Sequence, residues 1–259
     1  MGNSVGHGAE YGMGCVPSAP RDLHCDLHYD LHIHSCLSPC ADDDMTVHNI
    51  ANMAMLCGLD IIALTDHNTL KNCPPFFAAC KSAGVIPVAG VEINTREEVH
   101  VLCFFPSLDS AMDFDGFLYP LLPDIKNRPD IFGRQIILGG DDNPMGEEQK
   151  LLISACGIGI DELPALMASY GGTAVPAHID RPSNSLIANL GFIPEEYAFS
   201  CYEVKDLSRL PALAESNPAL AGKTIISNSD AHTLVGIPEK SHCLRMGAKS
   251  AKALIEALG

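Results

Sequence analysis

Residues 29–34, Tyr29-Asp30-Leu31-His32-Ile33-His34, begin as a short strand-like run and end in two histidines two positions apart. In a β-strand, residues i and i+2 point to the same face, so His32 and His34 can bind one ion without distorting the backbone. A lone pair of this kind is equally compatible with two solvated or buried imidazoles. The stretch therefore predicts a strand that carries a candidate metal site at its C-terminal end.

Four further apolar runs end in residues that bind metals. The runs are 61–65, 85–91, 173–177 and 224–229, and they lead into Asp66-His67, Glu92, His178 and Asp230-x-His232. Buried strands that repeatedly deliver an imidazole or a carboxylate at their C-terminal tips are typical of a barrel-like α/β enzyme with its ligands on one face. Packing alone rarely places so many ligands independently, so the set predicts a multinuclear metal centre.

The segments between these runs predict helices. Thr46 can cap a helix that Gly58 stops, and Pro74-Pro75 can open a second helix that Gly84 closes. This β-α-β-α-β order predicts parallel strands with right-handed crossovers. After residue 159 the alternation resumes, with a helix over 161–170, strands ending at residues 178, 204 and 230, and a last helix over 250–258.

Two parts of the chain depart from the alternation. Residues 1–28 are rich in Gly, Pro and Ser, which predicts a disordered extension ahead of a single domain over 29–259. Residues 106–159 are Pro-rich and acidic, and Asp141-Asp142-Asn143-Pro144 is a strong turn signal. We expect this stretch to be an insertion that holds a helix and a small hairpin.

Composition limits the classes of partner. With 259 residues and 47% hydrophobic content, the chain can bury one sizeable core. Its formal net charge of −16 would repel a phosphate backbone, which predicts that no nucleic-acid polymer is bound. The 11 cysteines are scattered and follow no secretory signal, so we expect reduced thiols and a cytoplasmic location. No stretch approaches the ~18–20 apolar residues that span a bilayer, so no membrane association is expected.

Taken together, these motifs resemble the polymerase and histidinol phosphatase (PHP) family of metal-dependent phosphoesterases. They stand here as residues 30–35 (DLHIHS), 64–68 (LTDHN), 90–93 (GVEI) with His100 downstream, 176–178 (PAH) and 229–232 (SDAH). The resemblance covers about residue 29 to the C-terminus apart from the insertion. It implies a distorted (β/α)7 barrel with two or three divalent manganese, iron or zinc ions and no organic cofactor.

The resemblance also implies a ligand set. His32, His34, Glu92 and Asp230 would bind the first ion; Glu92 would bridge to a second ion held by His100 and His178; and His67 and His232 would hold a third. The family usually completes the third site with a His at the position of Cys40, and a thiolate there would favour zinc. The alternatives are that Asp42, Asp43 or Asp44 provides the ligand, or that the third site is weak.

Asp66 is expected to orient a ligand or the attacking water through a hydrogen bond, although it could instead cap the following helix. With Glu92 and Asp230, it is one of three residues that we expect to act in catalysis. Arg181, Arg96 and Lys205 each follow a strand end and are candidate phosphate contacts, the alternative being ordinary surface ion pairs.

The predicted reaction is hydrolysis of a small phosphate ester, a monoester before a diester, by a metal-activated hydroxide, with a small phosphorylated metabolite as partner. A metal-activated hydroxide requires no nucleophilic side chain. The sequence agrees, because it has neither a G-x-S-x-G elbow nor a P-loop. One alternative is an amidohydrolase-type C–N hydrolase, for which Lys205 would be the only loose candidate for a carboxylated lysine. The other is a non-catalytic, metal-binding regulatory PHP module.

Overall fold

The computed structural model describes residues 25–240 and 242–259. Its main feature is a six-stranded sheet in the order β10-β1-β2-β3-β4-β7. The strands are β1 (Cys25–Ile33), β2 (Ile61–Leu64), β3 (Ile86–Asn94), β4 (His100–Phe105), β7 (Thr173–Pro176) and β10 (Cys243–Met246). The first three are parallel, as the β-α-β-α-β order predicts.

The predicted helix boundaries of the first half of the chain are confirmed. Thr46 caps α1 (Val47–Leu56) by accepting a hydrogen bond from a backbone N–H of the first turn. The second helix, α2 (Cys73–Ala83), has two prolines in its first turn and ends at Gly84. Gly84 has a φ of 76°, a left-handed conformation in which glycine meets no steric penalty.

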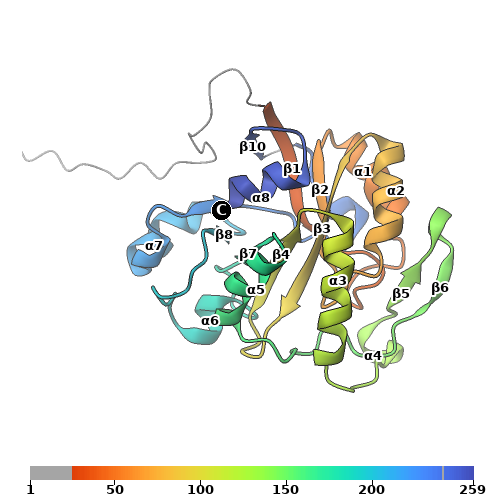
Figure 1. The fold of residues 1–259 in the computed structure, drawn as a ribbon, viewed down its shortest axis with the longest axis horizontal. Coiled ribbons are helices and arrows are strands. Elements are labelled where there is room, and N and C mark those ends of the chain that lie inside the picture. Colours follow the sequence, from red (N-terminus) through yellow and green to blue (C-terminus); the bar gives the residue numbers. More distant parts are fainter. Residues whose placement is uncertain (1–24, 241) are drawn as a thin grey trace, which may run out of the picture.

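Alternating side chains of the sheet enter two different hydrophobic cores. Ile62 and Leu64 of β2 pack in the core that also contains buried residues of α1, α2 and α3 (Leu108–Leu118). Ile61 and Ala63 pack in the other core, against the last helix, α8 (Ala251–Leu258). Figure 1 shows the same arrangement, with α1, α2 and α3 on one side of the sheet and α8 on the other.

The strands curl round one end of the molecule. A separate parallel pair, β8 (Cys201–Glu203) and β9 (Thr224–Ile226), lies between β7 and β1. The Ile179 N–H donates to the Glu203 carbonyl at 2.9 Å on one side, and the His34 N–H donates to the Ala231 carbonyl at 3.0 Å on the other. The mixed α/β class is therefore confirmed, as a curled half-barrel sheet. The sevenfold (β/α) count of the barrel is not confirmed, because β4 and β10 run antiparallel to their neighbours.

The stretch over 106–159 contains α3, a short α4 (Pro129–Phe132) and a hairpin of β5 (Ile136–Leu138) and β6 (Pro144–Glu147). Figure 1 shows the hairpin beside α2, at the edge of the molecule. The remaining helices are α5 (Leu163–Ser169), α6 (Leu186–Leu190) and α7 (Leu210–Ser216).

At the N-terminal side, β1 begins at Cys25, which is before the expected domain start at Tyr29. The remainder of the expected extension, residues 1–24, lies outside the described residues. Within the described ranges, no helix has the length and apolar content needed to cross a membrane.

Candidate metal centre

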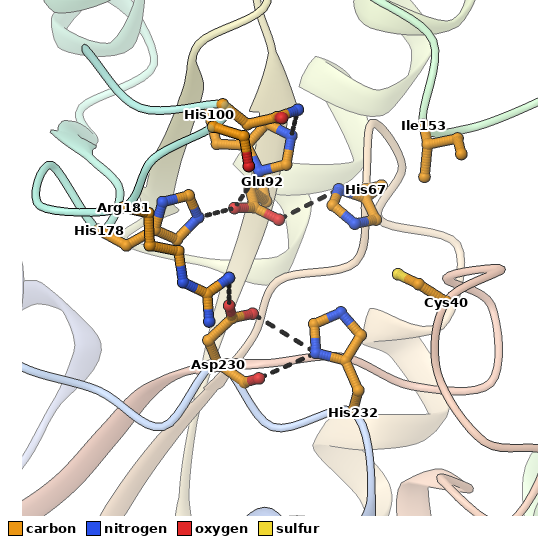
Figure 2. A pocket seen from close by; sticks show the side chains of 11 residues that line it. Cys40, His67, Glu92, His100, Ile153, His178, Arg181, Asp230 and His232 are labelled. Carbon is orange, nitrogen blue, oxygen red and sulfur yellow. Dashed lines mark hydrogen bonds and ion pairs between the residues drawn. The ribbon is translucent and has the colours of Figure 1, made fainter. Parts of the chain in front are cut away.

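The residues that the sequence places at strand ends come together around one pocket of about 280 Å³. It is lined by Cys40, His67, Glu92, His100, Ile153, His178, Arg181, Ser183, Asn184, Asp230 and His232. Figure 2 shows the imidazoles directed inward toward Glu92 and Asp230. The predicted ligands among them lie in or after β1, β2, β3, β4, β7 and β9, so the curl of the sheet is what assembles them.

Glu92 is at the centre of this arrangement. Five imidazole nitrogens lie within 3.3 Å of its two carboxylate oxygens: Nδ1 of His100 at 2.8 Å, Nδ1 of His67 at 3.1 Å, and Nε2 of His32, His34 and His178 at 3.3 Å. The side chain is buried. A carboxylate in this position can share its two oxygens between neighbouring ions.

A second carboxylate faces the histidines of β1. Oδ1 of Asp230 lies 3.2 Å from Nε2 of His32 and 3.3 Å from Nε2 of His34, and the two Nε2 atoms are 3.2 Å apart. The register between β1 and β2 shifts between Asp30 and Ile33, and His32 lies at this irregularity inside β1.

Three groups of ligand atoms are close enough to hold an ion each. In each group the atoms lie within 4.8 Å of one another, and the groups are His32-His34-Glu92, His67-Glu92-His100 and His34-His67-His232. Imidazole and carboxylate donors suit divalent transition metals. Nδ1 of His67 is also buried and makes no hydrogen bond, although a Glu92 oxygen lies 3.1 Å away, and such an atom is rare in folded proteins unless another ligand satisfies it. The side chains therefore fit a multinuclear metal centre.

The carboxylates of the pocket are in the form that binds metals. Burial alone would raise the pKa of Glu92, yet His100 and His32 hold that pKa well below its ordinary value. Burial likewise opposes ionisation of Asp230, but His32 and His34 hold its pKa low. Both groups are negatively charged at neutral pH.

Two imidazoles of the rim are held in the neutral form. Burial and the neighbouring His34 lower the pKa of His67 well below its ordinary value. The same two causes lower the pKa of His232 to about 4. A metal ligand must be deprotonated, so these rings need no proton loss before they bind an ion.

Asp66 lies behind the pocket and does not line it. Its carboxylate accepts hydrogen bonds from the Ser35 N–H at 2.7 Å, the Ser35 hydroxyl at 2.6 Å and the Ser38 hydroxyl at 2.7 Å. Oγ of Ser38 lies 2.9 Å from Nδ1 of His34. Ser38 therefore links the Asp66 carboxylate to His34, and the expected orienting role of Asp66 stays a prediction.

Cys40 lines the pocket, whereas the three neighbouring aspartates do not. Figure 2 shows its sulfur directed toward the side where His67 and His232 lie, although Cys40 belongs to none of the three ligand groups. Asp42, Asp43 and Asp44 are exposed, and Asp43 pairs with Arg134 at 3.3 Å. Of the loop residues considered as a third-site ligand, Cys40 is thus the one in position.

Only one of the three candidate phosphate contacts is in the pocket. Nη1 of Arg181 lies 2.6 Å from Oδ2 of Asp230. Arg96 is exposed, donates to the Gly157 carbonyl and pairs with Glu162. The Lys205 ammonium donates to backbone carbonyls and lies in a different pocket, beside Tyr29 and His242. A position just after a strand end does not fix the direction of a long side chain, which is why Arg96 and Lys205 were misplaced.

Besides Ser38, sequence reasoning missed two further residues that contact the histidines. Glu203 ends β8 and lies 3.1 Å from Nδ1 of His32. The Asn184 side-chain amide lies 3.0 Å from Nε2 of His100. Glu203 carries a signal that could have found it, since it too is a carboxylate at the end of an apolar run. Asn184 is in a loop and has no such signal.

The family follows from the sequence match. The chain matches the family model described as PHP domain over residues 30–167, more than half of its length. The chain belongs to the PHP domain family. Members of this family are metal-dependent hydrolases that bind several ions, and the ligand groups of this PHP domain are able to hold them. No curated protein matches the chain.

Solved structures share the fold of this PHP domain. The lesion-specific endonuclease PfuEndoQ from Pyrococcus furiosus is 20% identical, with a TM-score of 0.62, over 90% of this chain and 56% of that chain. Endonuclease Q in complex with a 27-mer duplex substrate with an abasic lesion is 19% identical, with a TM-score of 0.58, over 81% and 50%. A two-domain protein from Bacteroides vulgatus that contains a predicted PHP-like metal-dependent phosphoesterase is 16% identical, with a TM-score of 0.55, over 97% and 67%.

The chain spans about half the length of the two endonuclease structures, and at these identities the likeness is one of fold. The second comparison contradicts the prediction that no nucleic-acid polymer is bound, because a protein of the same fold holds a DNA duplex. The physical error was to argue from the net charge of the chain. Phosphate binding depends on the local field, and ions bound between Glu92 and Asp230 would invert the sign of that field at the pocket.

Proposed function

We propose that this PHP domain is a metal-dependent phosphoesterase that hydrolyses a small phosphate monoester. The observation that carries the proposal is the position of Glu92, whose oxygens face five imidazole nitrogens in a pocket that Arg181 also lines. Divalent ions bound in this cluster would provide positive charge, and Arg181 would provide a phosphate contact in the same pocket.

The proposed ligand assignment is that of the family pattern, which shares Glu92 between two ions as the three groups of side chains do, and adds Asp230, His178 and Cys40 to them. His32, His34, Glu92 and Asp230 would hold one ion, His100 and His178 a second that shares Glu92, and His67 and His232 a third with Cys40. When bound, divalent ions lower the pKa of a coordinated water to about 7 and neutralise the charge that develops on phosphoryl oxygens.

The residues of the chain hold and orient the substrate. The guanidinium of Arg181 is anchored by its contact with Asp230, and its other N–H donors match the forked geometry of a phosphoryl group. Ser183 and Asn184 add a hydroxyl and an amide on the same side of the pocket. The hydrogen bonds from Asp66 through Ser38 keep the His34 ring directed inward.

The size of the pocket and the position of Lys205 favour this substrate class. A volume of about 280 Å³ lies just below the range for small-molecule sites, roughly 300–1,000 Å³, and so suits a small ligand. C–N hydrolases of the rival amidohydrolase type commonly use a bridging carboxylated lysine beside the ligands. Lys205 lines the neighbouring pocket instead, and its ammonium contacts the carbonyls of Asn228 and Ser229.

The test is a panel of substrates with defined Mn²⁺, Fe²⁺ and Zn²⁺. The panel contains phosphomonoesters, phosphodiesters, amides and a DNA duplex with an abasic site. We expect the fastest turnover on monoesters, and a KM for them that rises about tenfold or more in Arg181→Gln, because a charged hydrogen bond of roughly 1.5–3 kcal/mol is lost.

Release of no phosphate from any ester by the metal-loaded protein would contradict the proposal and favour a regulatory module. Cleavage of the DNA without turnover of monoesters would replace the proposed substrate with nucleic acid.

A further inference from the structure

Glu203 is a buried carboxylate that faces the metal centre from behind. It is 1% exposed, and both of its oxygens lie 3.1 Å from Nδ1 of His32. Oε2 also accepts a hydrogen bond from the His178 N–H at 2.7 Å, and Oε1 accepts one from the Asn228 side chain at 2.7 Å. Its ion-pair partner is His32, and no lysine or arginine among the described residues pairs with it.

The contact with His32 determines how that ring faces the pocket. An ionised carboxylate only accepts hydrogen bonds, so Nδ1 of His32 must carry a hydrogen. A metal ligand must be deprotonated, and in that neutral form of the ring the lone pair is on Nε2, the atom that faces Glu92, Asp230 and His34. Histidine ligands of metals commonly donate their second N–H to a carboxylate in this way.

The contact with His178 holds a strained part of the backbone. His178 has a φ of 30°, a conformation that costs a non-glycine residue about 1–3 kcal/mol and persists only where the surroundings enforce it. Its N–H is bound by the Glu203 carboxylate, and the next N–H, of Ile179, is bound by the Glu203 carbonyl at 2.9 Å. Glu203 therefore restrains the two peptide groups that flank His178.

The two restrained histidines belong to different proposed ions. The rings of His32 and His178 stack with centroids 5.7 Å apart and an interplanar angle of 20°. Asn228 ties the same carboxylate to β1, because its Oδ1 accepts a hydrogen bond from the Leu31 N–H at 2.8 Å. β1, β7, β8 and the loop after β9 thus meet at Glu203.

We propose that Glu203 is a positioning residue of the metal centre, which fixes the His32 ring and the His178 backbone and so sets the spacing of two adjacent ions. This inference rests on the proposed metal binding. Glu203 belongs to none of the three ligand groups, so its effect passes through the two histidines.

The experiment compares metal affinity in Glu203→Gln, Glu203→Ala and the wild type. Each protein is stripped of metal, checked for folding by circular dichroism, and titrated with Mn²⁺ or Zn²⁺ alone in competition with a chelator. Glu203→Gln keeps the shape of the side chain and one acceptor oxygen, so it should fold and bind about 10- to 100-fold more weakly. Glu203→Ala removes both acceptor oxygens and should bind more weakly still.

Glu148→Gln is the matched control. Glu148 is also a buried glutamate with several hydrogen bonds, but it lies outside the pocket, so its loss should lower stability and leave metal affinity unchanged. Wild-type affinity in folded Glu203→Gln and Glu203→Ala would overturn the inference. A wild type that binds no metal would instead overturn the proposed function, so the two failures are distinguishable.

Discussion

Asp230 contacts His32, His34 and Arg181 through a single carboxylate. Its φ of 51° is left-handed, and asparagine adopts this conformation as readily as aspartate does. Asp230→Asn should therefore fold normally. Its turnover should fall by about 100-fold or more, because the loss of a charged metal ligand removes several kcal/mol of transition-state stabilisation. Steady-state kinetics with a circular dichroism control test this, and full activity in the variant would place the chemistry elsewhere.

Cys40 decides whether the third group of ligands is complete. Because its thiol lines the pocket on the side of His67 and His232, Cys40→Ala should bind about one ion fewer per chain, whereas Cys40→His should retain the wild-type number. Elemental analysis of the three proteins provides the measurement. Equal metal content in Cys40→Ala and the wild type would show that Cys40 is not a ligand.

The direction of the inward-facing side chains could be predicted best for residues that lie in a strand or directly after one. His32, His34, Glu92 and His100 lie in or directly after strands, so period-two geometry determines where their side chains point. Arg96 lies outside the pocket, because the direction of its side chain is set by a loop in which it pairs with Glu162. The roles of these ligands stay predictions until metal binding is measured.

At the scale of elements, the pocket depends on a segment of the insertion that two asparagines hold in place. The Asn94 amide donates to the Ile153 carbonyl at 2.9 Å, and the Asn68 amide donates to the carbonyls of Leu152 at 2.7 Å and Ser154 at 2.9 Å. Asn68 follows the ligand His67, and Ile153 is the aliphatic residue of the pocket lining.

Asn94→Ala should loosen this segment and leave the metal ligands in place. We expect KM to rise several-fold with little change in kcat, and the free energy of unfolding to fall by about 1–2 kcal/mol. Asn127→Ala, which removes a similar bond to the Gly133 carbonyl away from the pocket, serves as the control for steady-state kinetics. A kcat loss without a change in KM would argue that the segment supports the ligands themselves.

The insertion is also joined to the turn just before α2 by a partly buried ion pair. Glu148 contacts the Lys71 ammonium and accepts a hydrogen bond from the Tyr119 hydroxyl at 3.0 Å. Burial alone would raise the pKa of Glu148, but Lys71 and the Lys150 N–H hold it below its ordinary value.

A carboxyl group whose pKa is lower in the folded state stabilises the protein above its unfolded-state pKa of about 4.3, and this contribution is lost as the pH falls through the folded-state value. In metal-free protein, Glu148→Gln should cost about 1–3 kcal/mol at pH 7 and progressively less below pH ~4. Urea unfolding at pH 7 and pH 3.5 measures the difference, and a cost that is independent of pH would contradict this account.

Part of the arrangement of helices and strands could be predicted from the sequence. The boundaries of α1, α2 and α8 follow from local signals, namely Thr46 and Ser250 as caps and Gly84 as a stop. The antiparallel placement of β4 and β10 could not be predicted in this way, because no local pattern records which neighbour a strand pairs with or in which direction.

At the scale of the whole molecule, total charge proved a poor guide to partners. The chain carries a formal charge of −16, but Glu92, Asp230 and Glu203 are gathered among histidines at one end of the sheet, where bound ions would offset them. The remaining acidic residues say little about this pocket. A DNA duplex bound by a structure of the same fold illustrates the point.

The number of metal ions per chain tests the central claim most directly. Glu92 faces five imidazoles and belongs to two of the three ligand groups, so protein prepared without chelator should contain at least two transition-metal ions per chain by elemental analysis. Removal of these ions should also lower the melting temperature, since ions that bind the folded state stabilise it. A metal content near zero or one per chain, in correctly folded protein supplied with manganese, iron and zinc, would contradict a multinuclear centre.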